Sequence, residues 1–166
     1  MELEFLLAAA LAIFSGAMAV TRFSAVHALL YLIVALLALA VCFALLGAPF
    51  AAVLQVIIYA GAITVLFVFV VMMLNLGPAS EYREHAWLQP GQWRGPGLLA
   101  SLLLAEIVYV VLPGSGAEET LQVDAKAVGT VLFGPYLVIV ELASLLLLAG
   151  LVVAWHVGRG GIGETG

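Results

Sequence analysis

The chain consists of long apolar runs separated by short polar segments. Five runs are long enough to cross a bilayer as helices, because a hydrocarbon core about 30 Å thick takes roughly 20 helical residues. None of them alternates apolar and polar residues, as the strands of an outer-membrane barrel would. The pattern therefore predicts an all-α integral membrane protein with one membrane domain, residues 1–166. Its five transmembrane helices are expected at approximately 3–21, 25–46, 50–76, 97–112 and 135–157.

The polar segments predict how these helices are connected. Residues 22–24 and 47–49 are too few for anything but tight turns, so the first three helices should form antiparallel neighbours. Pro49 is well suited to the first turn of a helix, where its missing N–H costs nothing. Longer loops are expected at 77–96, on the cytoplasmic side, and at 113–134, on the external side.

Composition and charge support a membrane location and predict an orientation. The chain is 66% hydrophobic and only 9% charged, which a water-soluble domain cannot sustain. Arg22, Arg83, Arg94 and Arg159 all fall on one side of the predicted membrane, and only Lys126 falls on the other. Because basic loops stay in the cytoplasm, we expect the N-terminus outside, on the periplasmic side, and the C-terminus in the cytoplasm.

Two acidic residues lie inside predicted spans. An ionised side chain at the centre of a bilayer costs about 2.5–3.5 kcal/mol, so such residues rarely occur without a role. Glu106 and Glu141 each fall about 9 Å from the external end of their span, at 1.5 Å per helical residue. Two interpretations stay open: a proton relay formed by the two carboxyl groups, and structural carboxyl groups that hydrogen-bond to neighbouring helices.

The third predicted span contains an unusual local sequence, Tyr59-Ala60-Gly61-Ala62. A glycine there allows another helix to approach closely, as small residues do in membrane proteins. It would equally allow a π-bulge, in which one turn has i→i+5 hydrogen bonds and which is frequent at functional sites. The residues by themselves favour close packing.

The remaining residues do not suggest a catalytic centre. Cys42 is the only cysteine, so neither an iron–sulfur cluster nor a structural zinc is expected, and we interpret it as a buried small apolar residue. His27 has no second ligand at metal spacing and is interpreted as an interfacial histidine. Nucleotide-binding and nucleic-acid-binding motifs are not apparent. Gly150, Ala154 and Gly158 recur every four residues and predict a face for close helix packing.

Two segments resemble the J-type membrane subunit of bacterial NADH–quinone oxidoreductase, the respiratory complex I family. The run Val56–Leu74 is similar to the third helix of that family, with its Tyr-Ala-Gly-Ala followed by an apolar Phe- and Met-rich stretch. Leu132-Phe133, Tyr136 and 141–147 resemble its last helix. That family usually has Pro-Phe directly before the glutamate, whereas this chain has Ile139-Val140.

The resemblance implies a membrane subunit, without an active site of its own, of an enzyme that oxidises NADH, reduces a quinone and translocates protons. FMN, iron–sulfur clusters and the quinone would belong to other subunits. The implied partners are the K-, A- and H-type subunits, the antiporter-like subunits and lipid. The implied location is the bacterial inner membrane, which the chain would cross several times.

The resemblance also implies a role for the third helix. In the family, a π-bulge there is thought to relax to a regular α-helix and so control a path for water. The implied gating residues are Tyr59, Ala60, Gly61, Ala62, Val65 and Phe67. Two alternatives remain: a subunit of a multisubunit cation/proton antiporter, and a purely structural membrane subunit.

Overall fold

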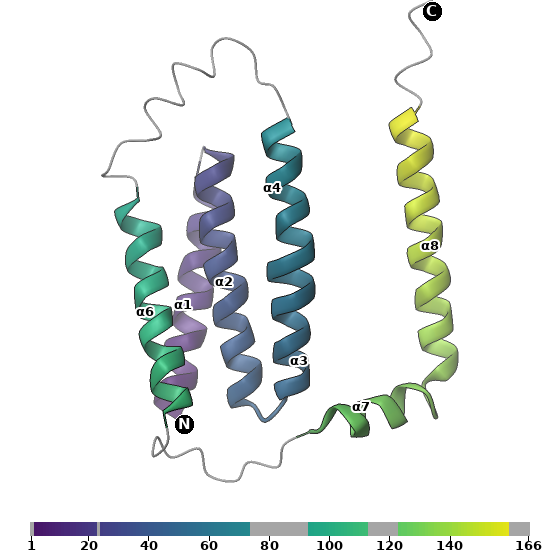
Figure 1. Ribbon diagram of the computed structural model, residues 1–166, viewed down its shortest axis with the longest axis horizontal. Coiled ribbons are helices and arrows are strands. Elements are labelled where there is room, and N and C mark those ends of the chain that lie inside the picture. Colours follow the sequence, from purple (N-terminus) through teal and green to yellow (C-terminus); the bar gives the residue numbers. More distant parts are fainter. Residues whose placement is uncertain (1, 23, 74–92, 113–122, 160–166) are drawn as a thin grey trace, which may run out of the picture. The chain divides into compact units, whose positions relative to one another are not determined.

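A computed structural model describes residues 2–22, 24–73, 93–112 and 123–159, and within these ranges the regular secondary structure is entirely helical. Within the described residues, five helical segments are long and apolar enough to cross a membrane, which confirms the predicted all-α class and number of spans. The elements, labelled in Figure 1, are α1 (Glu2–Thr21), α2 (Ala25–Leu45), α3 (Pro49–Leu54), η1 (Gln55–Ile63), α4 (Thr64–Met73), α6 (Arg94–Val111), α7 (Ala125–Leu132) and α8 (Leu137–Arg159).

The helix ends differ in detail from the predicted ones. The third span is continuous from Pro49 to Met73 through α3, η1 and α4, and the rest of its predicted length lies outside the described residues. Helix α6 begins at Arg94 rather than 97, because Pro96 is tolerated in the first turn of a helix. Helix α7 lies inside the segment predicted as an external loop, and no helix was predicted there. The orientation of the termini stays a prediction.

The chain divides into two compact units, Met1–Val123 and Asp124–Gly166. In the first unit α2 is the central helix: α1 and α6 pack against it, and so do α3, η1 and α4 (Figure 1). Cys42 is buried in this core, as predicted. The core residues come from α1, α2 and α6, and they are Ala8, Leu11, Tyr31, Val34, Ala38, Val41, Cys42, Leu99 and Leu103.

The turn between α2 and α3 has the geometry of a glycine C-cap. Gly47 has a φ of 77°, which favours glycine because a Cβ is strained there. Its N–H donates to the carbonyl oxygen of Ala44 at 3.1 Å, and the Ala48 N–H donates to that of Phe43 at 3.0 Å. These two bonds define a Schellman motif, which ends α2 sharply. Pro49 then begins α3, as its sequence position predicted.

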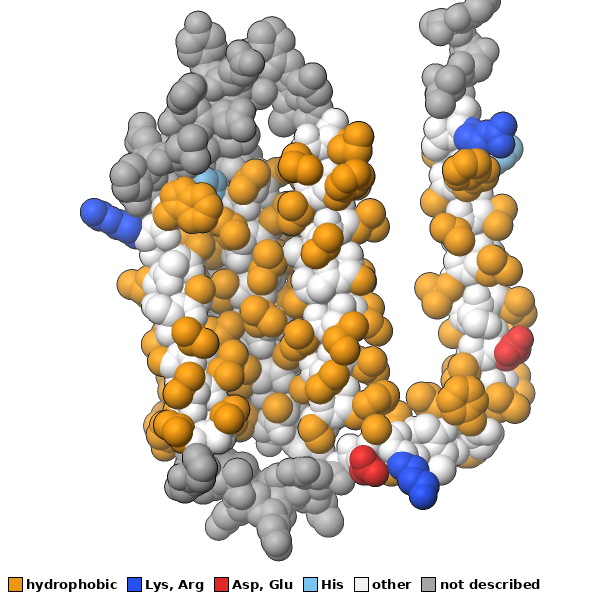
Figure 2. Space-filling model, viewed as in Figure 1, with side chains coloured by type: hydrophobic (Ala, Val, Ile, Leu, Met, Phe, Trp, Pro, Cys, Tyr) orange, Lys and Arg blue, Asp and Glu red, His pale blue; other side chains and the backbone are white. Residues whose placement is uncertain are grey.

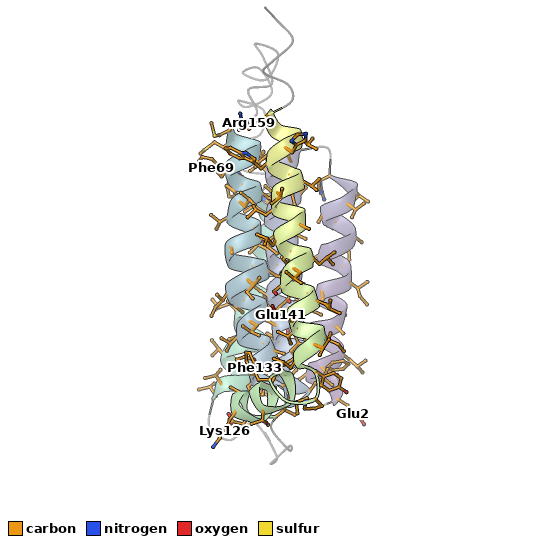
Figure 3. The ribbon with its side chains drawn as sticks, turned by 90° about the vertical axis from the view of Figure 1, so that its right-hand side faces the viewer. Glu2, Phe69, Lys126, Phe133, Glu141 and Arg159 are labelled. Carbon is orange, nitrogen blue, oxygen red and sulfur yellow. The ribbon has the colours of Figure 1, made fainter. Side chains whose placement is uncertain are left out.

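The second unit contains α7 and α8, which meet at a steep angle (Figures 1 and 3). The turn between them passes through Gly134, where a Cβ would lie only 2.6 Å from the carbonyl oxygen of Thr130. Helix α8 has no buried residue, and its surface is almost wholly apolar (Figure 2). Such a surface requires lipid or other protein chains around it. Whether the two units form the one predicted membrane domain stays a prediction.

Candidate functional site

The third span is interrupted by nine residues of π-helix, from Gln55 to Ile63. In this geometry each N–H bonds to the carbonyl oxygen five residues earlier, one residue further than in an α-helix. Regular α-helix precedes it in α3 and follows it in α4. The Tyr59–Gly61 segment therefore lies in a π-helix that is longer than the single bulge implied by the family resemblance.

The C-terminal end of the π-helix is held by Thr64. Its backbone N–H is directed to the carbonyl oxygens of Gly61 and Tyr59, and its hydroxyl donates to that of Tyr59 at 2.8 Å. Thr64 is only 1% exposed, so water does not compete for this hydroxyl. The hydroxyl of Thr64 thus stabilises an i→i−5 connection rather than the i→i−4 connection of an α-helix.

Gly61 lies close to the backbone of its own π-helix. A Cβ built on it would lie 3.2 Å from the carbonyl oxygen of Val56, again five residues earlier. That distance is shorter than an ordinary van der Waals contact, so an added side chain would require the π-turn to move. The sequence predicted that Gly61 lets another helix approach closely. In the structure the close neighbour is instead the backbone of its own helix.

The π-helix presents different faces to the unit and to its surroundings. Gln55 and Thr64, at its two ends, are buried, and α2 is the neighbouring helix that η1 and α4 contact. Tyr59 is instead 50% exposed, and Val65 and Phe67 of α4 are exposed as well. Ala62 is exposed too, so four of the six predicted gating residues face outward from this unit.

Gln55 and Thr64 were absent from the predicted site residues. The sequence gives a weak indication of both, since each is a polar residue at one end of an otherwise apolar stretch. Only the fold reveals that both are buried at the ends of one π-helix.

Glu106 lies at the interface of α6 with α1 and α2. Both carboxyl oxygens are shielded from solvent, and neither makes a hydrogen bond within the described part of the chain. Ala8 and Glu4 of α1 and Cys42 of α2 lie in its surroundings. An unpartnered buried carboxyl group is costly, so this one requires water or a proton.

Glu141 is placed differently. It lies in the first two turns of α8, on an exposed surface of the second unit (Figure 3), and its carbonyl oxygen accepts a 2.7 Å hydrogen bond from the Ser144 hydroxyl. Glu106 belongs to the first unit, so their predicted pairing stays a prediction. Among the described residues, no three His, Cys, Asp or Glu side chains are grouped as metal ligands would be.

These features define a class: a helical, polytopic membrane protein whose distinctive site is a π-helix within one span. The family model for NADH-ubiquinone/plastoquinone oxidoreductase chain 6 matches residues 15–157, which is most of the chain. The chain therefore belongs to that family, as its third and last helices had suggested.

Individual relatives are similar over nearly the whole length. NADH-quinone oxidoreductase subunit J of Pseudomonas aeruginosa is 56% identical over 96% of this chain and 97% of its own. The subunit J of Escherichia coli K12 is 53% identical over 96% of this chain and 87% of its own. That of Buchnera aphidicola from Schizaphis graminum is 44% identical over 96% of this chain and 98% of its own.

Proposed function

We propose that this protein is a membrane subunit of a proton-translocating NADH–quinone oxidoreductase, in which the third span acts as a switch. The observation that carries the proposal is the π-helix Gln55–Ile63, in a chain similar along its length to J subunits of that enzyme. A π-helix differs from an α-helix by one residue in its hydrogen-bond register, so it provides two alternative arrangements of one segment.

The switch follows from helix geometry. Moving the hydrogen bonds of η1 from i→i−5 to i→i−4 changes the register by one residue, which corresponds to a rotation of about 100°. Residues on either side of the shift, such as Tyr59 and Phe67, would rotate relative to one another. Gly61 lets the backbone adopt the π-turn, and the Thr64 hydroxyl stabilises it. Rotation would exchange polar and apolar groups along the exposed side of the span, and so open or close a path for water.

Proton handling is proposed for the two membrane carboxyl groups. Glu106 has no hydrogen-bond partner among the described residues, which suits a group that exchanges a proton with trapped water. Glu141 is exposed in its unit and would require a polar partner from outside that unit.

The electron-transfer chemistry would belong to other subunits. One buried cysteine, Cys42, does not fit an iron–sulfur cluster, which several thiolates must hold. FMN, the clusters and the quinone are therefore assigned to the rest of the complex, and this chain would have no active site of its own. We propose the K-, A- and H-type and antiporter-like subunits as its neighbours, in a bacterial inner membrane, with the N-terminus outside.

The test is Gly61→Val in the assembled complex. The added side chain conflicts with the Val56 carbonyl oxygen, so we expect one helix register to be held and both quinone-linked turnover and proton translocation to fall. Gly97→Val is the matched control, because a Cβ at Gly97 of α6 meets no atom within 4 Å. Normal turnover and normal pumping in an assembled Gly61→Val complex would show that the π-helix is structural.

A further inference from the structure

Helix α1 ends, and α2 and α6 begin, at the same end of the first unit (Figure 1). Cationic and aromatic side chains gather there with the two helix N-termini. We call this group the Arg22 cluster and define it as Arg22, Ser24, His27, Trp93 and Arg94. We propose that it binds the phosphate headgroup of an anionic phospholipid.

The first observation is a pair of adjacent helix N-termini. The His27 ring of α2 contacts Trp93, the residue that precedes α6, edge to face with ring centroids 6.2 Å apart. Tyr31, one turn further along α2, lies so close to Gly95 that a Cβ on the glycine would collide with its hydroxyl. Helices α2 and α6 therefore start side by side and direct their first N–H groups toward the same end of the unit.

Neither N-terminus is neutralised by its own side chains. Both helices lack an acidic residue in the first turn, and neither has a capping hydrogen bond from a side chain. The free N–H groups and the aligned peptide dipoles leave a partial positive charge at each start, which favours an anion. Because the two helices start side by side, their partial positive charges both attract an anion bound between them.

The second, independent observation is His27. It is only 4% exposed, and its Nδ1 lies 3.1 Å from the Ser24 hydroxyl, which is thereby directed away from capping α2. When that hydroxyl donates to Nδ1, the ring proton is on Nε2. Nε2 is buried without a hydrogen-bond partner among the described residues. A headgroup oxygen bound between the two N-termini supplies the missing acceptor.

Two arginines complete the cluster. The Arg22 guanidinium lies 5.2 Å from the centre of the Tyr31 ring, and its one hydrogen bond within the described part of the chain goes to the Met18 sulfur at 3.4 Å. Most of its donors thus remain available, in the planar arrangement that matches a phosphate. Arg94 is exposed at the start of α6. The described acids of this unit, Glu2, Glu4 and Glu106, lie in the other half of their helices.

A lipid phosphate is favoured over other anions by the position of the cluster. It lies at the ends of three apolar helices, where a headgroup would lie in a membrane. Trp93 is half exposed there, and tryptophan is enriched at that level of the bilayer. Basic groups between the ends of membrane helices are a recurring way of binding anionic headgroups.

The test compares three purified, assembled complexes: the native one, the Arg22→Gln/Arg94→Gln double variant and the Arg159→Gln variant. Arg159 is a matched control, since it also lies over an aromatic ring, 5.6 Å from the centre of Trp155, but at the C-terminus of a helix. Each complex is delipidated and titrated with phosphatidylglycerol, phosphatidylcholine or inorganic phosphate. Bound lipid is counted by mass spectrometry.

We expect the double variant to bind phosphatidylglycerol about 30-fold more weakly, from the loss of two headgroup-facing cations, while Arg159→Gln binds normally. Equal retention in all three complexes would overturn the proposal. Phosphatidylcholine bound as tightly as phosphatidylglycerol would also overturn it. Inorganic phosphate that competes at the same concentration as the lipid would overturn it too, and would identify a site for free anions. Loss of a neighbouring subunit with unchanged lipid content would identify an acidic protein partner instead. Arg94→Glu places a negative charge in the Arg22 cluster. Because this charge repels the headgroup phosphate, the variant should bind phosphatidylglycerol more weakly than the other variants do.

Discussion

The hydroxyl of Thr64 donates a 2.8 Å hydrogen bond to the carbonyl oxygen of Tyr59, five residues earlier in the chain. The same oxygen lies in the direction of the Thr64 backbone N–H. A threonine in a regular α-helix bonds to a carbonyl three or four residues back, so this bond belongs to the π register. The Thr64 side chain thus favours the π register over the α register.

Thr64→Val should weaken the π register, because valine has nearly the same shape without the hydroxyl. A hydrogen bond of this kind contributes about 1 kcal/mol, enough to shift a balanced equilibrium between registers about fivefold. Amide hydrogen exchange across residues 59–64 in the assembled complex would detect faster opening. Thr64→Ser retains the hydroxyl and should exchange like the native protein. Unchanged exchange in the valine variant would mean that packing alone holds the π-helix.

Gly95→Ala should weaken the packing of α6 on α2, because its Cβ collides with the Tyr31 hydroxyl. Overpacking of this kind costs about 1–3 kcal/mol. Thermal unfolding of the assembled complex, together with its yield, measures the loss. Tyr31→Phe removes the colliding oxygen and should restore much of the stability when combined with Gly95→Ala. Additive losses in the double variant would show that the two residues are not coupled.

Gly134→Ala should disrupt the turn between α7 and α8, since its Cβ would lie 2.6 Å from the Thr130 carbonyl oxygen. Backbone cannot yield as a flexible side chain does, so we expect reduced assembly of the complex. Gly129→Ala, in α7, is the control, because nothing lies within 4 Å of the added Cβ there. Blue-native electrophoresis would compare the two variants. Equal assembly would show that the turn is free to rearrange.

Glu106→Leu separates stability from proton handling. The carboxyl oxygens are buried without hydrogen-bond partners among the described residues, and removing such a group relieves a cost of about 1–3 kcal/mol. The leucine variant is therefore expected to assemble with equal or higher thermal stability, and to pump fewer protons per quinone reduced. Glu106→Gln, which preserves shape and polarity but cannot ionise, should show the same pumping defect. Native pumping in both variants would assign Glu106 a structural role only.

The candidate site was partly predictable from sequence. Tyr59 and Gly61 stood out as chemically unusual in an apolar span, and the resemblance to a known helix supplied the expectation of a π-turn there. The length of the π-helix and the role of Thr64 were not predictable, because hydrogen-bond register depends on the balance of packing against α2. His27 was expected at the interface and lies in the first turn of α2. Its burial against Trp93 depends on a contact between residues 66 positions apart in the sequence.

The sequence by itself determined the class of protein, the number of spans and the sharp turn at Gly47-Ala48-Pro49. These features depend on local rules: hydrophobic length, helix propensity and the φ angle that glycine alone adopts easily. The tertiary structure decided what no local rule contains. It placed α2 at the centre of the first unit, buried Glu106 between helices and brought the N-termini of α2 and α6 together. The physical reason is that apolar membrane helices have few strongly different faces, so their neighbours are chosen by shape, small residues and scattered polar contacts.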